Sequence, residues 1–181
     1  MIPVEAKKEL GLLQIYTGNG RGKTSAALGL AFRASGHGLK ILIAQFMKAS
    51  GYYGEETTSH RLPNITWKTF GRHDFVDLTT PEEIDQNLAK AGWEFTKKAL
   101  LSEDYDMIIL DEANVALACK LIPLEEMIQA LKTRTPQVEV ILTGRYAPEE
   151  ILELADLVTE MKEVRHPFAE NKIEARQGIE Y

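Results

Sequence analysis

Cysteine is almost absent from this sequence, since Cys119 is the only one among 181 residues. A single thiol forms no disulfide within the chain, and zinc sites built from several thiolates are excluded. A chain without disulfides suits a reducing compartment, so we expect the protein to be cytoplasmic. Cys119 itself is interpreted as a packed helix residue.

Long hydrophobic runs are also missing. No segment approaches the ~20 consecutive apolar residues that a transmembrane helix requires. The first ten residues contain Lys7 and Lys8 but lack the apolar core of a secretory signal peptide. We therefore expect neither a membrane partner nor secretion by an obvious route.

Basic residues are not in excess. The 21 lysines and arginines are outnumbered by 27 aspartates and glutamates, which gives a formal net charge of −6. A broad basic surface for nucleic acid is therefore not expected. The hydrophobic share of 44% is ordinary for a globular protein. The length suits one domain, residues 1–181, with a short N-terminal arm at 1–11 and a C-terminal tail at 166–181.

Four short apolar runs predict buried β-strands. They lack the alternation of half-exposed strands, which favours a parallel sheet covered on both faces. Helical patterns lie between them, and alternating strands and helices predict right-handed crossovers in a three-layer α/β domain with a mostly parallel central sheet. The predicted strands are residues 12–16, 39–46, 107–110 and 138–142.

The sequence also marks helix starts and irregular segments. A helix over 23–34 should end at the glycines of residues 36–38. A second helix is predicted from Thr80, as N-cap, to about Leu101, with Pro81 as its first residue and Glu83 as the capping-box partner. Pro123 and Pro148 should begin two more helices. Residues 49–63, 71–79 and the tail are expected to be irregular and to supply substrate contacts.

A glycine-rich loop, Thr17–Ser25, lies directly between the first predicted strand and the first predicted helix. A phosphate site needs backbone N–H groups turned inward, and Gly18, Gly20 and Gly22 provide the conformational freedom for that turn. The helix that follows adds the positive end of its dipole. The segment therefore predicts a phosphate-binding loop, and the fold prediction becomes a P-loop NTPase domain with a recombinase-like core.

Three side chains at the end of this loop carry the expected chemistry. Lys23 should place its ammonium group on phosphate oxygens, and the Thr24 hydroxyl should bind the Mg²⁺ that accompanies a nucleotide. Ser25 adds a hydroxyl contact. The usual motif has glycine where this chain has Thr17, so its first position departs from the pattern. A glycine-rich turn with a chance Lys-Thr pair is the structural alternative.

The predicted strand 107–110 is followed by Asp111 and Glu112. Parallel strands bring their carboxyl ends to one edge of the sheet, so both carboxylates should lie beside the phosphate loop and hold Mg²⁺ directly or through water. Taken alone, such a pair of carboxylates is equally consistent with a helix cap. Together with Lys23 and Thr24 it indicates a site for a nucleoside triphosphate and its metal.

Eight segments, which include the phosphate loop and the strand end just described, resemble the P-loop ATP:corrinoid adenosyltransferases of cobalamin biosynthesis and salvage. Threonine at the first motif position is usual in that family. The resemblance is strong over residues 12–47 and 106–181 and weaker between them. The segments that carry it are residues 17–24, 33–38, 45–46, 110–112, 123–126, 143–145, 155–160 and 177–181.

The resemblance implies transfer of the 5′-deoxyadenosyl group of ATP to the Co(I) of a corrinoid, with release of triphosphate. It also implies Mg²⁺ with ATP, a homodimer, and an electron-donating flavoprotein or reductase. By the same resemblance, Lys23, Thr24 and Glu112 are the catalytic candidates, and Thr24, Glu112 and Asp111 the metal candidates. The implied ATP-binding residues are Gly18, Asn19, Gly20, Arg21, Gly22, Lys23, Thr24, Ser25 and Arg33.

Two positions depart from the family pattern. The arm before the first strand is shorter than the one that helps cover the corrinoid in relatives. The aromatic residue of the central loop is displaced, which makes Phe75 the candidate corrinoid lid, with ordinary loop packing as the equal alternative. Arg33 is equally well explained as a solvated helix residue.

The phosphate loop by itself allows other functions. One alternative is a phosphate-cleaving ATPase or kinase in which Glu112 orients a water or an acceptor hydroxyl. Another is a nucleotide-dependent binding module without catalysis. The identity of the products separates these readings.

Overall fold

The computed structural model describes residues 9–74 and 76–181. In these residues the chain forms one six-stranded sheet in which every pairing is parallel, in the order β3-β2-β4-β5-β1-β6. The three-layer α/β prediction is confirmed. The strands are β1 (Leu13–Thr17), β2 (Ile41–Phe46), β3 (Ile65–Phe70), β4 (Met107–Asp111), β5 (Glu139–Thr143) and β6 (Leu157–Glu160).

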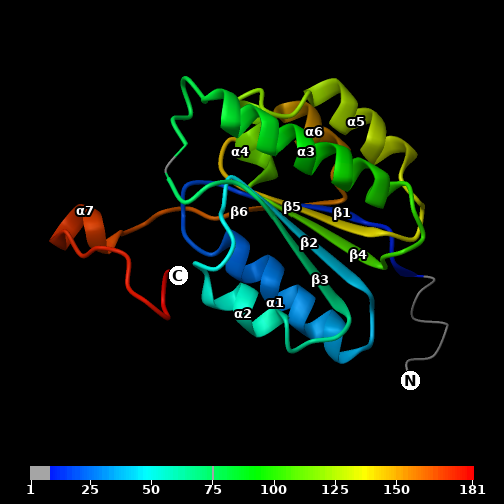
Figure 1. The fold of residues 1–181 in the computed structure, drawn as a ribbon, viewed down its shortest axis with the longest axis horizontal. Helices are drawn as coiled ribbons and strands as arrows, with labels where there is room; N and C mark the ends of the chain where they lie inside the picture. The colour runs from blue at the N-terminus through cyan, green and yellow to red at the C-terminus, as the bar shows by residue number, and fades with distance from the viewer. Residues whose placement is uncertain (1–8, 75) are drawn as a thin grey trace.

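Helices cover both faces of the sheet (Figure 1). The helices α3, α4, α5 and α6 lie on one face and α1 and α2 on the other, while α7 stands away from the body. Within the described part of the chain, every helix is too short or too polar to span a membrane. The bounds are α1 (Lys23–Gly36), α2 (Gly54–Ser59), α3 (Glu83–Leu100), α4 (Ala113–Ala118), α5 (Leu124–Thr133), α6 (Glu149–Leu154) and α7 (Pro167–Asn171).

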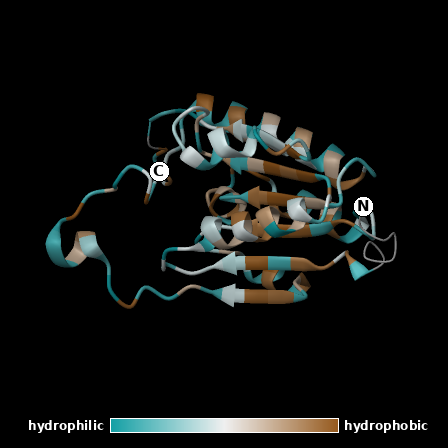
Figure 2. Ribbon diagram, turned by 90° about the horizontal axis from the view of Figure 1, so that it is seen from below, coloured by the Kyte–Doolittle hydropathy of each residue, from teal (hydrophilic) through white to brown (hydrophobic). Residues whose placement is uncertain are grey.

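The hydrophobic core lies on both faces of the sheet. The larger cluster packs the sheet against α3, α4 and α5 around Trp93, and the smaller one packs it against α1 through Ala27 and Ala31. The strands are mostly hydrophobic along their length (Figure 2), and all six residues of β2 are buried. Double-sided burial explains why the central strands read as continuous apolar runs.

The two strands that the sequence did not predict are the edges of the sheet. Within β3, Trp67 is buried whereas Lys68 is exposed, and all four residues of β6 are exposed. Edge strands bury less surface and carry a weaker apolar signal. The segment 49–63, expected to be irregular, contains the short helix α2.

The predicted start of α3 was wrong by two residues. The N-cap is Glu82, and its capping-box partner is Asp85 rather than Glu83. Thr80 is used elsewhere, since its hydroxyl donates a hydrogen bond to Asp77 Oδ2 at 3.0 Å. Phe75, the candidate corrinoid lid, lies outside the described residues.

After β6 the chain leaves the body, forms α7 and returns. Figures 1 and 2 show that the C-terminus lies near the loops that precede α1 and α2. In Figure 2 the strand arrowheads point to that same side of the molecule. The carboxyl ends of the strands, the phosphate-loop segment and the end of the chain therefore meet in one region.

Candidate functional site

The loop from Thr17 to Lys23 joins β1 to α1, as the sequence predicted. Gly22 is the N-cap of α1 with a φ of 119°, and Gly18 has a φ of 93°, so both occupy the left-handed region that favours glycine. A Cβ atom on Gly20 would lie 2.7 Å from the carbonyl oxygen of Met161. The Gly20 N–H donates to that oxygen at 2.6 Å, which ties the loop to the segment after β6.

Lys23 folds back over the loop. Its Nζ donates to the carbonyl oxygen of Gly18 at 2.8 Å and to that of Gly20 at 2.7 Å. Partial burial lowers the pKa of the Lys23 ammonium group, and Glu112 acts against that shift. The lysine thus presents a positive charge at the first turn of α1, where an anion is also favoured by the helix dipole.

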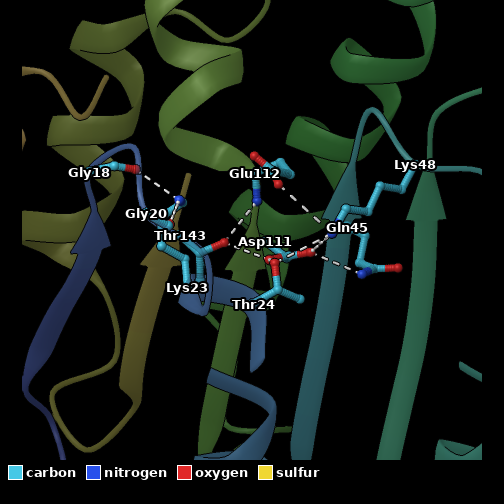
Figure 3. A network of polar contacts seen from close by, with 9 residues as sticks. All are labelled: Gly18, Gly20, Lys23, Thr24, Gln45, Lys48, Asp111, Glu112 and Thr143. Carbon is cyan, nitrogen blue, oxygen red and sulfur yellow. Dashed lines mark hydrogen bonds and ion pairs between the residues drawn. The ribbon is translucent and has the colours of Figure 1, made fainter. Parts of the chain in front are cut away.

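Asp111 is the centre of a buried hydrogen-bond network (Figure 3). Its Oδ1 accepts from the Thr24 hydroxyl at 2.8 Å and from the Thr143 hydroxyl at 2.6 Å. Its Oδ2 accepts from Gln45 Nε2 at 2.9 Å and from Lys48 Nζ at 2.7 Å. Opposite charge and hydrogen bonds lower the pKa of Asp111 despite its complete burial.

Lys48 is a site residue that the sequence analysis missed. Its Nζ lies 2.7 Å from Asp111 Oδ2, 3.9 Å from Glu112 Oε1 and 3.4 Å from Thr24 Oγ1. The adjacent carboxylates raise its pKa to about 12 although burial opposes the charge. A signal was present, because Lys48 follows the predicted strand 39–46 and strands of a parallel sheet end at one edge.

Glu112 follows β4 in a left-handed conformation, with a φ of 59°. Such a backbone is uncommon for a residue other than glycine, and it places Glu112 at the N-cap of α4. Burial and the neighbouring Asp111 charge raise the pKa of Glu112. Its side chain is 25% exposed and is less engaged than that of Asp111, so its oxygens face the cavity described next.

A cavity of about 590 Å³ opens above the loop. The structure brings most of the predicted ATP-binding residues to it, and adds Arg145, which lies two residues after β5, and the last four residues of the chain. Two of the predicted residues, Gly18 and Arg33, do not line it. Arg33 is exposed in the last turn of α1. The wall comprises residues 19–25, Leu28, Lys48, Tyr53, Gly54, Glu55, Glu112, Arg145, His166 and residues 178–181.

A second cavity of about 410 Å³ lies beside the first. Lys48, Tyr53 and Glu112 line both cavities and therefore form the boundary between them. Asp74 and Val76 line the second cavity, so the chain neighbours of Phe75 lie at its wall. The other lining residues are Met47, Ala49, Tyr52, Arg72, His73 and Leu78.

The side-chain oxygen atoms of Thr24 and Glu112 beside the loop suit a magnesium ion that is carried by a nucleotide. Among the described residues, no group of three or more His, Cys, Asp or Glu side chains is arranged to hold a metal alone. Magnesium in nucleotide sites takes one or two protein oxygens and completes its shell with phosphates and water. Thr24 and Glu112 match that need, whereas Asp111 already accepts four hydrogen bonds and is suited to orient Thr24.

Comparison with known proteins adds a family and several relatives. A family model described as "ATP:corrinoid adenosyltransferase BtuR/CobO/CobP" matches residues 9–181. A protein named corrinoid adenosyltransferase from Escherichia coli (strain K12) is 37% identical over 98% of this chain and 89% of its own length. Another from Pseudomonas aeruginosa is 35% identical over 98% of this chain and 87% of its own. Corrinoid adenosyltransferase CobA from Salmonella typhimurium is 36% identical, with coverage of 98% and 89%.

Proposed function

The chain belongs to the family of ATP:corrinoid adenosyltransferases, and from this membership we propose that it transfers the 5′-deoxyadenosyl group of ATP to a reduced corrinoid. The observation that carries the proposal is the pair of adjoining cavities. One is lined by the phosphate loop, and the other meets it at Lys48, Tyr53 and Glu112. Two substrates bound side by side would place their reacting atoms at that boundary.

The transfer is a displacement at carbon. The Co(I) of the corrinoid substrate provides an electron pair to the 5′ carbon of ATP, and a Co–C bond forms while the C–O bond to the triphosphate breaks. The electron pair of that bond leaves with the triphosphate, and the cobalt becomes formally Co(III). No proton moves, so the protein needs no general base. Its contribution is positioning and stabilisation of charge on the leaving group.

The residues of the ATP cavity supply that stabilisation. We assign Lys23 and the loop of residues 18–25 to the triphosphate, because their ammonium and N–H groups lie at the N-terminus of α1. Arg21, Lys48 and Arg145 line the same wall and add further cationic groups. Mg²⁺ held by Thr24 and Glu112 would supply further neutralisation of phosphate charge.

The second cavity is assigned to the corrinoid. A corrin ring is larger than this space, so we expect one face or edge of the ring to enter it. Phe75 remains the proposed lid residue, supported by the position of Asp74 and Val76 in the wall. A cytoplasmic location, a homodimer and an electron-donating flavoprotein or reductase belong to the same proposal.

The deciding experiment is anaerobic incubation with ATP, Mg²⁺ and a chemically reduced corrinoid. We expect the absorption spectrum of a Co–C bond to appear together with an equal amount of tripolyphosphate. Lys23→Ala should lose most ATP affinity, because the phosphates lose a charged partner worth about 1.5–3 kcal/mol. Lys68→Ala is the matched control, since Lys68 is an exposed lysine on β3.

The products discriminate between reactions. ADP or inorganic phosphate, formed without a Co–C bond, would indicate attack at phosphorus and would overturn the proposal in favour of an ATPase or kinase. ATP binding without any turnover would favour a binding module. Unchanged ATP affinity in Lys23→Ala would show that the loop has a structural role instead.

A further inference from the structure

The last four residues of the chain form part of the ATP cavity. After α7 the tail turns back toward the body, and Gly178, Ile179, Glu180 and Tyr181 line the same cavity as the phosphate loop. The turn is closed on itself, since the Gly178 N–H donates to the carbonyl oxygen of Tyr181 at 2.7 Å. Gly178 has a φ of 76°, which favours glycine at this position.

One attachment joins the tail to the phosphate loop. Arg21 Nη1 donates to Glu180 Oε1 at 2.9 Å, and Arg21 Nη2 donates to the carbonyl oxygen of Ile179. The same carboxylate is held by Arg176, whose Nη2 lies 2.9 Å from Glu180 Oε1. The backbone N–H of Arg176 also donates to Glu180 Oε2, at 2.7 Å.

A second attachment joins the tail to the loop before α2. The Tyr181 ring stacks on the Tyr52 ring, with centroids 4.8 Å apart and planes 16° from parallel. Tyr52 also contacts Tyr53 edge to face at 5.2 Å. Because Tyr53 lines the boundary between the two cavities, the tail reaches from the phosphate loop to the place where the substrates are proposed to meet.

We propose that residues 178–181 are a positioning element of the ATP site, held across it by the Arg21–Glu180 pair and the Tyr52–Tyr181 stack. The segment keeps Arg21 directed along the cavity wall and slows the escape of a bound polyphosphate. This inference rests on the proposed use of ATP. It assigns a role in substrate retention to residues 178–181, which have no part in the binding of triphosphate by the phosphate loop.

The negative charge that this segment brings to the ATP cavity is offset by guanidinium groups. Glu180 brings one negative charge into the wall, and two guanidinium groups, Arg21 and Arg176, surround it. Arg21 lines the ATP cavity whereas Arg176 lies outside its wall, so Arg21 is the one of the two that faces a bound anion. The attachments are also exposed, with Arg21 53% and Glu180 25% accessible. Exposed ion pairs contribute little individually, so the segment can open to admit ATP.

The test uses the full chain, a chain ending at Gln177, and the variants Tyr181→Ala, Tyr181→Phe and Glu180→Gln. ATP affinity and dissociation rate are measured with Mg²⁺ and without corrinoid, by calorimetry and by stopped flow with a fluorescent ATP analogue. The truncation should raise Kd about 10-fold, mainly through faster dissociation. Tyr181→Ala should weaken binding less, and Tyr181→Phe should restore it because the ring stack is retained.

Adenosyl transfer then separates positioning from structure. We expect KM for ATP to rise in the truncated chain while kcat at saturating ATP stays within about twofold. Glu174→Gln is the matched control, since it removes a tail carboxylate that does not line the ATP cavity. It should leave affinity, dissociation rate and melting temperature unchanged.

Two outcomes overturn the inference. One is an unchanged Kd and dissociation rate in both the truncated chain and Tyr181→Ala. The other is tighter ATP binding after either change, which would make the tail a competitor of ATP. Because binding is measured without corrinoid, a tail effect on ATP in a chain that forms no Co–C bond would refute the proposed function and leave this inference standing.

Discussion

Asp111 and Lys48 form a buried ion pair at the floor of the ATP cavity. The Asp111 side chain is 1% exposed and that of Lys48 is 14% exposed. The neutral donors around Asp111, such as Thr24 and Gln45, stabilise its charge through hydrogen bonds but do not cancel it. A buried carboxylate that loses its cation is costly because these hydrogen bonds do not fully replace the hydration that the charge lost on burial.

Replacing Lys48 by methionine should therefore destabilise the protein strongly. We expect a loss of about 3–5 kcal/mol in the free energy of unfolding, as is typical when one partner of a buried pair is removed. Urea unfolding at neutral pH measures this loss in the free energy of unfolding. Asp111→Asn in the same background should recover part of the loss, because the amide has no charge to compensate.

Lys68→Met serves as the control, since Lys68 is exposed on the edge strand β3. A Lys48→Met protein with the urea midpoint of the unaltered chain would contradict the assignment. In that case the ion pair would contribute nothing to stability, and Asp111 would have another source of compensation.

The entry to α3 is set by a local network. Asp77 Oδ1 accepts from the Thr79 N–H at 2.8 Å and from the Thr79 hydroxyl at 2.6 Å, and Oδ2 accepts from the Thr80 hydroxyl. With Thr80 used in this turn, the helix begins after Glu82. Arg72 binds both Glu82 and Asp85 and fixes that start.

This network predicts a pH dependence. Hydrogen bonds from Thr79 and Thr80 lower the pKa of Asp77 from 3.8 to about 2. A folded-state pKa below the unfolded value gives stability that is fully present above about pH 4 and is lost as pH falls through about 2. Asp77→Asn should therefore have a flatter stability profile between pH 4 and 2 in urea titrations.

Direct titration of the Asp77 carboxyl by NMR provides the control for that assignment. A pKa near the ordinary aspartate value would rule the network out as the cause. The matched control variant is Asp74→Asn, which removes the same charge from a loop carboxyl outside the turn.

The strands of the sheet differ in how well the sequence predicts them. The four central strands were predicted because burial on both faces leaves an unbroken apolar run. Both edge strands were missed because most of their residues are partly or fully exposed. In the site, Lys23, Thr24, Asp111 and Glu112 belong to recognisable local patterns. Lys48 belongs to no recognisable motif, and its only signal is its place shortly after the predicted strand 39–46, whose position beside β4 the sequence does not reveal.

At the scale of the whole molecule, the segment of residues 164–173, here called the C-terminal arm, displays apolar side chains to solvent. Val164 is 83% exposed, Phe168 52% and Ile173 45%. Contiguous apolar exposure commonly marks an interaction surface. This is consistent with the homodimer implied by the family resemblance.

We expect sedimentation velocity to give a species of twice the 20.3 kDa chain mass at micromolar concentration. Dilution should shift it toward the monomer. A single monomeric species across the whole concentration range would refute the homodimer and would leave the arm as a feature of one chain alone.

The pairing of β1 has a consequence for how the protein is made. Its neighbours in the sheet are β5 and β6, with Leu13 opposite Val140 and Gln14 opposite Leu157. Such distant partners slow folding, and the ribosome releases the first strand long before the last. The phosphate loop follows β1, and the Gly20 N–H in that loop donates a hydrogen bond to the carbonyl oxygen of Met161. A nascent chain therefore completes the sheet around its phosphate loop only after β6 and Met161 have been synthesised, and a product that stops before β5 lacks both sheet neighbours of β1.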